Sequence, residues 1–198
     1  SKTIQSEINN NTIMNCLKYS LDVINSLDLF TGQAEIKGNY FYGCNYCVII
    51  VYLAYHQKES IIADNIFENI HIYNPSNSDD VKQLYLMYLI PSNDGSITLV
   101  NNLFIDTSSP HGSLGIYIPI CAYCEFRNCS VLNSVDSHAF ELIYKINSFD
   151  STVRFVFNDC VFQNNVNSNN TIFMSLDYDL SFSNCIFKSN SNGCIYAN

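Results

Sequence analysis

The sequence is poor in charged residues, and it has half as many basic residues as acidic ones. Charged residues make up 14% of the 198 residues, whereas apolar residues make up 47%. This composition is typical of a folded protein rather than an intrinsically disordered one. Nine Lys and Arg residues against eighteen Asp and Glu residues give a net charge of −9. So acidic a surface repels phosphate backbones and anionic lipids, which predicts no nucleic-acid partner and favours cations or basic partners.

Long hydrophobic runs are also missing. No stretch approaches the ~18 uninterrupted apolar residues of a transmembrane helix, so no direct membrane insertion is predicted for this segment. The longest apolar run, Cys47–Tyr55, has the length of a strand. The first residues, SKTIQSEINNN, lack the apolar core of a signal peptide. Because such a segment is removed by processing, this absence leaves the compartment open.

Familiar catalytic motifs are missing as well. The sequence contains no Gly-rich phosphate loop and no G-x-S-x-G motif. We therefore predict no cofactor, and no residue stands out as catalytic.

What the sequence does contain is a short pattern that returns six times. A large apolar residue is followed by two polar or small residues, then Asn or Cys, any residue, and usually Phe. The copies begin at Ile36, Ile62, Leu99, Phe126, Phe157 and Phe182, which are 26, 37, 27, 31 and 25 residues apart. A repeat of this period is typical of a solenoid, in which one unit stacks on the next. The longest spacing holds a polar insertion, residues 69–83, which is expected to leave the solenoid as a loop.

Three strand-like segments recur in each period. Residues 171–176 are β-branched and aromatic, a turn follows, and residues 180–182 and 185–187 are two further strands separated by a bend. Three short strands in ~25 residues, separated by Asn, Ser, Asp and Gly, predict an all-β fold. The specific prediction is a right-handed parallel β-helix solenoid of about six to seven coils.

Two interior columns follow from this stacking, because equivalent positions in successive coils lie ~4.8 Å apart. The fourth position of the repeat is Asn39, Asn65, Asn102, Cys129, Cys160 and Cys185. We expect the Asn side chains to bond amide to amide, and the thiols to pack as small apolar groups that need no such partners. The sixth position is Phe41, Phe67, Phe104, Val131, Phe162 and Phe187, which we expect to form an aromatic stack.

The two ends of the sequence differ from its middle. Residues 1–35 are predicted to form an irregular N-terminal coil or cap, and residues 36–198 a single solenoid domain. Within residues 12–29 the spacing of Ile13, Leu17, Leu21 and Ile24 indicates either a helix or a degraded coil. A new strand begins at Cys194. Since a bare solenoid end exposes unpaired backbone, we expect end-to-end continuation with further coils or another chain. The sequence is therefore expected to be a segment of a longer chain.

The nine cysteines allow three interpretations. Cys44 with Cys47, and Cys121 with Cys124, resemble halves of a zinc site, but they are much farther apart than in zinc ribbons. Disulfides between coils fit the permitted Cα separation. Stacked parallel positions hold their side chains side by side, so we expect buried reduced thiols and no metal site.

Candidate binding residues lie on the first strands of the coils and in the turns that follow. The tyrosines Tyr52, Tyr88, Tyr117 and Tyr144 favour an aromatic shelf for sugar rings or a protein partner. The carboxylates Glu141, Asp177 and Asp179, with Lys145, are the best cluster for polysaccharide cleavage, which needs converging carboxylates. Solvated turn residues are the simpler interpretation of the same carboxylates.

One resemblance to a known family involves the third strand and its loop. Phe162–Asn165 and Phe187–Asn190 look like the F-x-x-N element of the polymorphic outer membrane protein repeats, and Gly193–Ile195 resembles the G-G-A-I element. The resemblance covers the C-terminal third, whereas Ile70 and Thr107 stand where upstream copies would need Asn. It implies a pectin-lyase-like β-helix in an adhesin at the cell surface or outside the cell, with no catalytic residues to transfer.

These observations favour a non-enzymatic, rigid surface that serves adhesion or assembly by contact with protein or glycan. Two alternatives stay open, namely a fragment of a carbohydrate-active lyase or hydrolase and an intracellular filament or cytoskeletal component. The N-x-[ST] triplets at Asn10, Asn128 and Asn169 are compatible with secretion.

Overall fold

The chain forms strands and bends. The computed structural model describes residues 3–15, 21–25, 31–44, 49–53, 59–72, 86–90, 96–108, 114–117, 123–136, 140–143, 153–167, 172–174, 178–191 and 195–197. No α-helix occurs within these ranges, and every described strand pair is parallel. The predicted all-β, parallel character is therefore confirmed.

Three sheets of seven strands and one short pair account for the strands. The first sheet contains β1 (Thr3–Asn9), β4 (Thr31–Lys37), β7 (Glu59–Ala63), β10 (Ser96–Val100), β13 (Tyr123–Arg127), β17 (Val153–Asn158) and β21 (Tyr178–Ser183). The second contains β2 (Thr12–Met14), β5 (Tyr40–Tyr42), β8 (Ile66–His71), β11 (Leu103–Ser108), β14 (Ser130–Leu132), β18 (Val161–Gln163) and β22 (Ile186–Lys188). The third contains β3 (Leu21–Asn25), β6 (Ile49–Leu53), β9 (Met87–Ile90), β12 (Leu114–Tyr117), β16 (Phe140–Ile143), β20 (Ile172–Met174) and β23 (Ile195–Ala197). The pair is β15 (Val135–Asp136) and β19 (Val166–Asn167).

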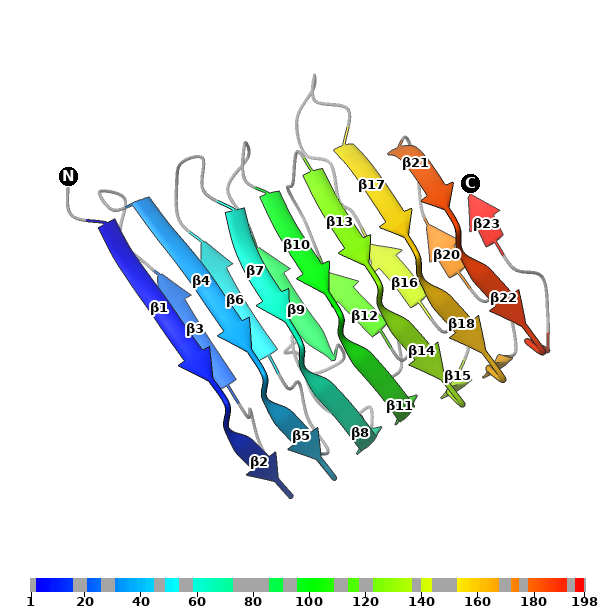
Figure 1. The fold of residues 1–198 in the computed structure, drawn as a ribbon, viewed down its shortest axis with the longest axis horizontal. Coiled ribbons are helices and arrows are strands. Elements are labelled where there is room, and N and C mark those ends of the chain that lie inside the picture. Colours follow the sequence, from blue (N-terminus) through cyan, green and yellow to red (C-terminus); the bar gives the residue numbers. More distant parts are fainter. Residues whose placement is uncertain are drawn as a thin grey trace, which may run out of the picture.

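The chain visits the three sheets in turn, so that strands one repeat apart lie side by side (Figure 1). The register follows the sequence pattern, because Ile62 lies between Ile36 and Leu99, all three being first residues of the repeat. The arrangement is consistent with a parallel β-solenoid. Of the polar insertion, residues 69–71 belong to β8, and residues 73–83 lie outside the described ranges.

The N-terminal residues follow the same scheme as the rest of the chain. β1 pairs with β4 over seven residues, and the expected boundary at residue 35 falls inside β4. Ile13 lies in β2 beside Phe41, and Leu21 begins β3. The helical interpretation of residues 12–29 is therefore wrong for the described residues. Pairing with β5 and β6 satisfies the backbone and brings Ile13 against the core, which outweighs a helical spacing of apolar residues.

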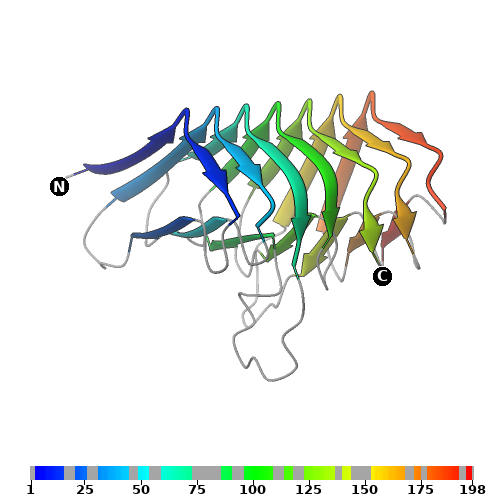
Figure 2. The same cartoon turned by 90° about the horizontal axis from the view of Figure 1, so that it is seen from below.

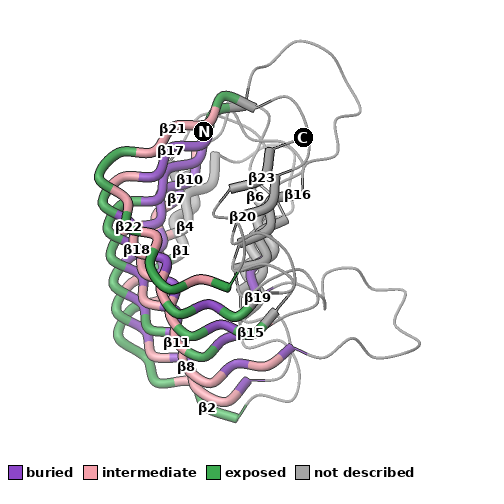
Figure 3. The backbone as a smooth tube through the Cα atoms, turned by 90° about the vertical axis from the view of Figure 1, so that its right-hand side faces the viewer, coloured by how far each residue is buried: buried purple, intermediate pink, exposed green. Residues whose placement is uncertain are grey.

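A sharp bend joins each strand of the first sheet to the next strand of the second. Each bend begins with a residue of positive φ, in the order Asn10, Gly38, Asp64, Asn101, Asn128, Asp159 and Asn184. Asn, Asp and Gly are the residues that adopt this left-handed conformation at least cost. In Figure 2 these bends form a row of corners along one edge. Figure 3 shows exposed positions along this corner and buried positions along the strands on either side of it.

The residue after each left-handed position points inward and forms a ladder along the solenoid. Asn39 donates its backbone N–H and its Nδ2 to Oδ1 of Asn65, at 2.9 and 3.0 Å. Asn65 donates in the same way to Asn102, at 3.1 and 3.0 Å. Each amide also donates to a carbonyl of the preceding coil, as Asn102 does to Ile62 at 2.7 Å. This ladder satisfies backbone groups that the bend buries away from water.

Cysteines continue the ladder in the later coils, and they do so through hydrogen bonds. The backbone N–H of Cys129 donates to the sulfur of Cys160, as that of Asn39 does to Asn65. The Cys160 thiol lies 3.4 Å from the Phe126 carbonyl and donates to it, and the Cys185 thiol donates likewise to Phe157. Cys129 and Cys160 lie in the apolar core, as expected, and the thiols form hydrogen bonds in addition, which were not expected. Hydrogen bonding with Cys129 and burial raise the pKa of Cys160, which keeps this thiol protonated and able to donate.

Aromatic rings fill the space between the first and second sheets. Phe41, Phe67 and Phe104 stack at centroid distances of 4.9 and 4.7 Å in the early coils. In the later coils the first repeat position also becomes aromatic, and Phe157 stacks on Phe126 at 4.6 Å and on Phe182 at 4.8 Å. Stacked rings at this spacing bury large apolar area and hold successive coils in register.

A second polar ladder lies at the next bend, after the second sheet. Its column is Cys44, Ile70, Thr107, Ser134, Asn165 and Asn190, all buried except the half-buried Asn190. Ser134 donates its backbone N–H and its hydroxyl to Oδ1 of Asn165. Asn165 donates in turn to Asn190 at 3.1 and 3.0 Å. Along the chain this column therefore changes from apolar to amide residues, as the first column changes from amide to thiol.

Loss of one amide from the first ladder should cost more stability than loss of one thiol. Replacing Asn102 with Leu removes the acceptor of Asn65 and the donor to Ile62 inside the core, so we expect a loss of about 3 kcal/mol or more. Cys160→Ala removes weaker bonds to sulfur and should cost about 1–2 kcal/mol. Urea unfolding measures both, with the exposed Asn9→Leu as a control for composition. Equal losses for Asn102→Leu and Cys160→Ala would contradict the ladder.

Candidate interaction surface

The tyrosines predicted to form a shelf lie in the third sheet. Tyr52 is in β6, Tyr88 in β9 and Tyr117 in β12. The register pairs Tyr88 with Tyr117, whereas Tyr52 pairs with Ile90. The backbone thus brings two of the three into one row. Their side chains, and the whole of Tyr144, lie outside what the structure describes.

The predicted carboxylate cluster is divided between sheets. Glu141 lies in β16 of the third sheet, whereas Asp179 lies in β21 of the first. Asp179 is exposed, and its Oδ2 is 3.6 Å from Nε of Arg154. Residues 144–150 and 175–177, which hold Lys145 and Asp177, are outside the described ranges. The two described carboxylates therefore do not share one strand face.

The outward face of the second sheet is largely apolar. Strand alternation directs its central Phe residues inward and leaves two outward columns. One column is Thr12, Tyr40, Ile66, Leu103, Ser130, Val161 and Ile186, and the other is Met14, Tyr42, Glu68, Ile105, Leu132, Gln163 and Lys188. All of these are half-buried or exposed, and only Glu68 and Lys188 are charged. We call these two columns the apolar strip.

Polar bends border the apolar strip on both sides. The first bend carries the left-handed Asn, Asp and Gly residues named above, and Asn101 there donates to Asp64 at 2.8 Å and accepts from Asn128 at 2.9 Å. The second bend carries Asn133 and Asn164, with 3.3 Å between Nδ2 and Oδ1. An apolar surface with a polar rim is typical of a protein interaction site.

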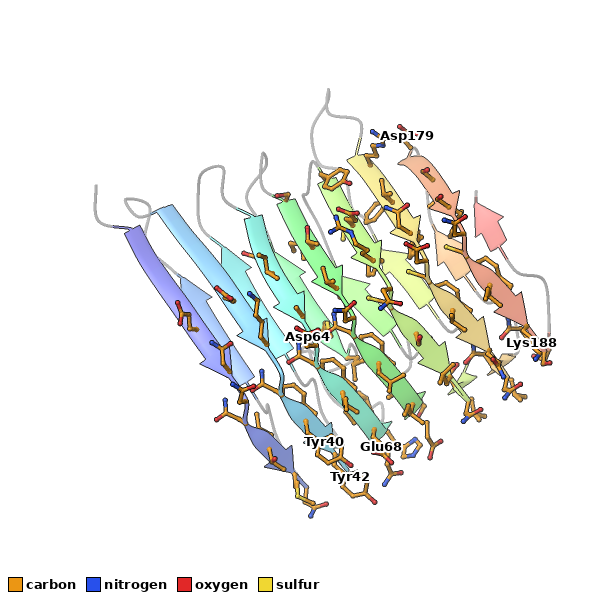
Figure 4. All side chains as sticks on the ribbon, in the orientation of Figure 1. Tyr40, Tyr42, Asp64, Glu68, Asp179 and Lys188 are labelled. Atoms are coloured by element: carbon orange, nitrogen blue, oxygen red, sulfur yellow. The ribbon has the colours of Figure 1, made fainter. Side chains whose placement is uncertain are left out.

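Two tyrosines and one carboxylate form a polar group on β5 and β8 of the apolar strip. The Tyr40 hydroxyl donates to Oε2 of Glu68 at 2.7 Å, which joins β5 to β8. The ring of Tyr42 lies 6.1 Å from that of Tyr40, and Figure 4 shows both near Glu68, with Lys188 at the opposite end of the sheet. The hydrogen bond to the Glu68 carboxylate raises the pKa of Tyr40, because it favours the protonated phenol.

A second polar cluster lies on the outward face of the first sheet. Glu125 is 8% exposed, and its Oε1 accepts from Nη2 of Arg127 at 2.8 Å and from Asn158 at 3.1 Å. Burial alone would raise the pKa of Glu125, but the bonds from Arg127 and Asn158, the charge of Arg127 and the Tyr123 hydroxyl together lower it. Because Arg127 neutralises this carboxylate and several donors occupy it, the cluster is a fixed ion pair that ties β13 to β17.

The described side chains do not gather into a metal site or a membrane helix. Within the described ranges no group of three or more His, Cys, Asp or Glu side chains could hold a metal ion. Of the two C-x-x-C pairs, Cys44 and Cys124 are buried, and Cys47 and Cys121 lie outside the described ranges. Among the residues placed by the structure, no helix has the length and hydrophobicity needed to span a bilayer.

Comparison with known proteins assigns no role to the apolar strip. No family model, no curated protein and no solved structure matches the chain.

Sequence reasoning missed the apolar strip, although its signal was present. Tyr40 and Tyr42 flank Phe41 in the third strand of the first copy, and apolar residues recur beside the sixth position in the later copies. Alternation alone places these residues outside once the Phe column is inside. The predicted shelf was placed on the first strands of the coils instead, because Tyr residues are more frequent there.

The Glu125 cluster should make stability depend on acid. Because the folded-state pKa of Glu125 is lowered, its contribution is present at neutral pH and is lost as the pH falls through that folded-state value. We expect Glu125→Gln to be less stable than the wild type near neutral pH. The difference should shrink in acid, below the ordinary Glu pKa of about 4.3. Urea unfolding at neutral pH and again in acid measures this difference, with Glu7→Gln at an exposed position as the control. A difference that stays constant with pH would contradict the ion pair.

Proposed function

We propose that this chain is a segment of a right-handed parallel β-helix that serves as a rigid surface for adhesion or assembly. The observation that carries the proposal is the apolar strip, which is open on the second sheet and bordered by polar bends. Right-handedness is the usual hand of parallel crossover connections, and three strands in each repeat would give about seven coils. The F-x-x-N likeness to polymorphic outer membrane protein repeats is in keeping with a surface-displayed or secreted segment.

Rigidity supports a role in contact rather than in conformational switching. Amide ladders at two bends and stacked rings between the sheets fix each coil against its neighbours. A surface whose backbone is already ordered loses no backbone entropy when a partner binds. The apolar strip thus has a fixed shape to present, over seven parallel strands.

The proposed location at the cell surface or outside the cell is compatible with the thiol ladder. Burial raises the pKa of the Cys185 thiol, and hydrogen bonding with burial does so for Cys160. Cys129 and Cys160 are buried and Cys185 is half-buried, which limits the access of oxidants and disulfides to the sulfur atoms. The ladder can therefore persist in an oxidising compartment as well as in a reducing one.

Beads coated with the chain test whether the apolar strip mediates contact. We expect coated beads to clump or to attach to a glycan array, and Ile66→Asp, at a strip position 38% exposed, to abolish this. Val166→Asp, at a position 58% exposed outside the strip, is the matched control and should leave contact intact. Equal loss in both variants would contradict the proposal. Turnover of a polyuronide by the wild-type chain would instead favour the lyase or hydrolase alternative.

A further inference from the structure

The two charged residues of the apolar strip lie in the same outward column. Counted along that column, Glu68 stands third, Leu132 fifth and Lys188 seventh. Leu132 is therefore midway between a carboxylate and an ammonium group, and each of them is two strands away from it. If the column of a second copy lay against it in reverse order about Leu132, each carboxylate would therefore meet an ammonium group.

Two copies can pack with these faces together, related by a two-fold axis that runs parallel to β14. The column of one copy then lies against the same column of the other copy, with the order of the strands reversed. Glu68 would then lie opposite Lys188 of the second copy, and the same pair would form again on the other side of the axis. Packed sheets lie about 10 Å apart, which a Glu and a Lys side chain can bridge together. Leu132 would meet its own equivalent at the centre.

The other outward column matches in the same register. Ile66 and Ile186, which are 38% and 53% exposed, stand third and seventh in it and would face each other. Leu103 and Val161, at the fourth and sixth positions, would likewise meet. Both exposed isoleucines of the strip would thereby be buried against apolar partners.

Other registers leave charges unmatched. An axis along β11 would overlap all seven strands, but it would set Glu68 against Leu132 and Lys188 against Met14 of the second copy. Burying an unpaired charge against an apolar side chain is costly, so the larger overlap loses more than it gains. The charges of the first bend also fit the axis along β14. Asp64 would face Asn184 and Asp159 would face Asn101, so that no carboxylate of this bend would lie opposite another.

We propose that the apolar strip binds a second copy of this chain face to face, centred on β14, with Glu68 of each copy paired to Lys188 of the other. This inference rests on the proposed function and names the partner of the same surface. The dimer would leave β2 and β5 uncovered, with Met14, Tyr40 and Tyr42 open to another molecule.

Charge reversal with rescue tests this pairing in analytical ultracentrifugation. The wild-type chain should form dimers. Lys188→Glu sets two carboxylates face to face on each side of the axis and should weaken dimerisation at least about tenfold, as should Glu68→Lys. The double variant carrying both changes exchanges the two charges and should restore the dimer. Lys37→Glu, the same change on the first sheet, should leave dimerisation unaltered.

Several results would overturn the pairing. One is a wild-type chain that stays monomeric at concentrations near 1 mM, which means a dissociation constant weaker than about 1 mM. Another is dimerisation that ignores both single reversals, and a third is single defects that the double variant fails to repair. Circular dichroism confirms that each variant is folded. If the chain is monomeric but Ile66→Asp still abolishes attachment of the beads to the glycan array, the second copy is excluded and the adhesive surface stands.

Discussion

The polar ladder at the first bend is the constraint on which the rest of this structure depends. A chain that turns inward at every coil buries backbone N–H and C=O groups, and each must find a partner. The side chain after the left-handed residue supplies one acceptor and one donor per coil, as Asn65 does toward Asn39 and Ile36. Because the acceptor belongs to the next coil, the bond fixes both spacing and register. The Phe columns and both flanking sheets inherit that register, and with it the outward columns of the apolar strip.

The ladder also shows that an amide and a thiol can perform the same task at different strength. Oδ1 of Asn102 and the sulfur of Cys160 both accept a backbone N–H from the preceding coil, and both residues donate to a carbonyl of that coil. Sulfur forms weaker bonds. The second bend changes in the opposite sense, since Asn165 and Asn190 appear where the first bend has turned to Cys. Strong amide bonding is therefore present at one bend or the other along most of the described solenoid.

Much of the fold could be predicted from the sequence, because the columns repeat at fixed positions. The Asn and Phe positions stand out since burial restricts them strongly. The thiol bonds could not be predicted, because Cys is equally at home as an apolar residue. Asn165 and Asn190 stood out only as part of the F-x-x-N element, and their ladder was not predicted because the same column holds Ile70 and Thr107 in earlier coils. Of the two alternatives near Ile13, the helix is wrong because local spacing carries no information about pairing with β5. The apolar strip went unpredicted since outward positions vary from coil to coil and only their three-dimensional alignment shows a pattern.

Hydrogen exchange at the backbone amides of Asn39 and Asn65 tests the ladder most directly. Both N–H groups donate to a buried side-chain oxygen of the next coil, so only opening of the bend exposes them to water. The ladder predicts that both exchange as slowly as the amides of the central strands, with those of Cys129 and Cys160, whose acceptors are sulfur, exchanging somewhat faster. Exchange of Asn39 and Asn65 at the rate of an unfolded chain, while the strands stay protected, would contradict this account.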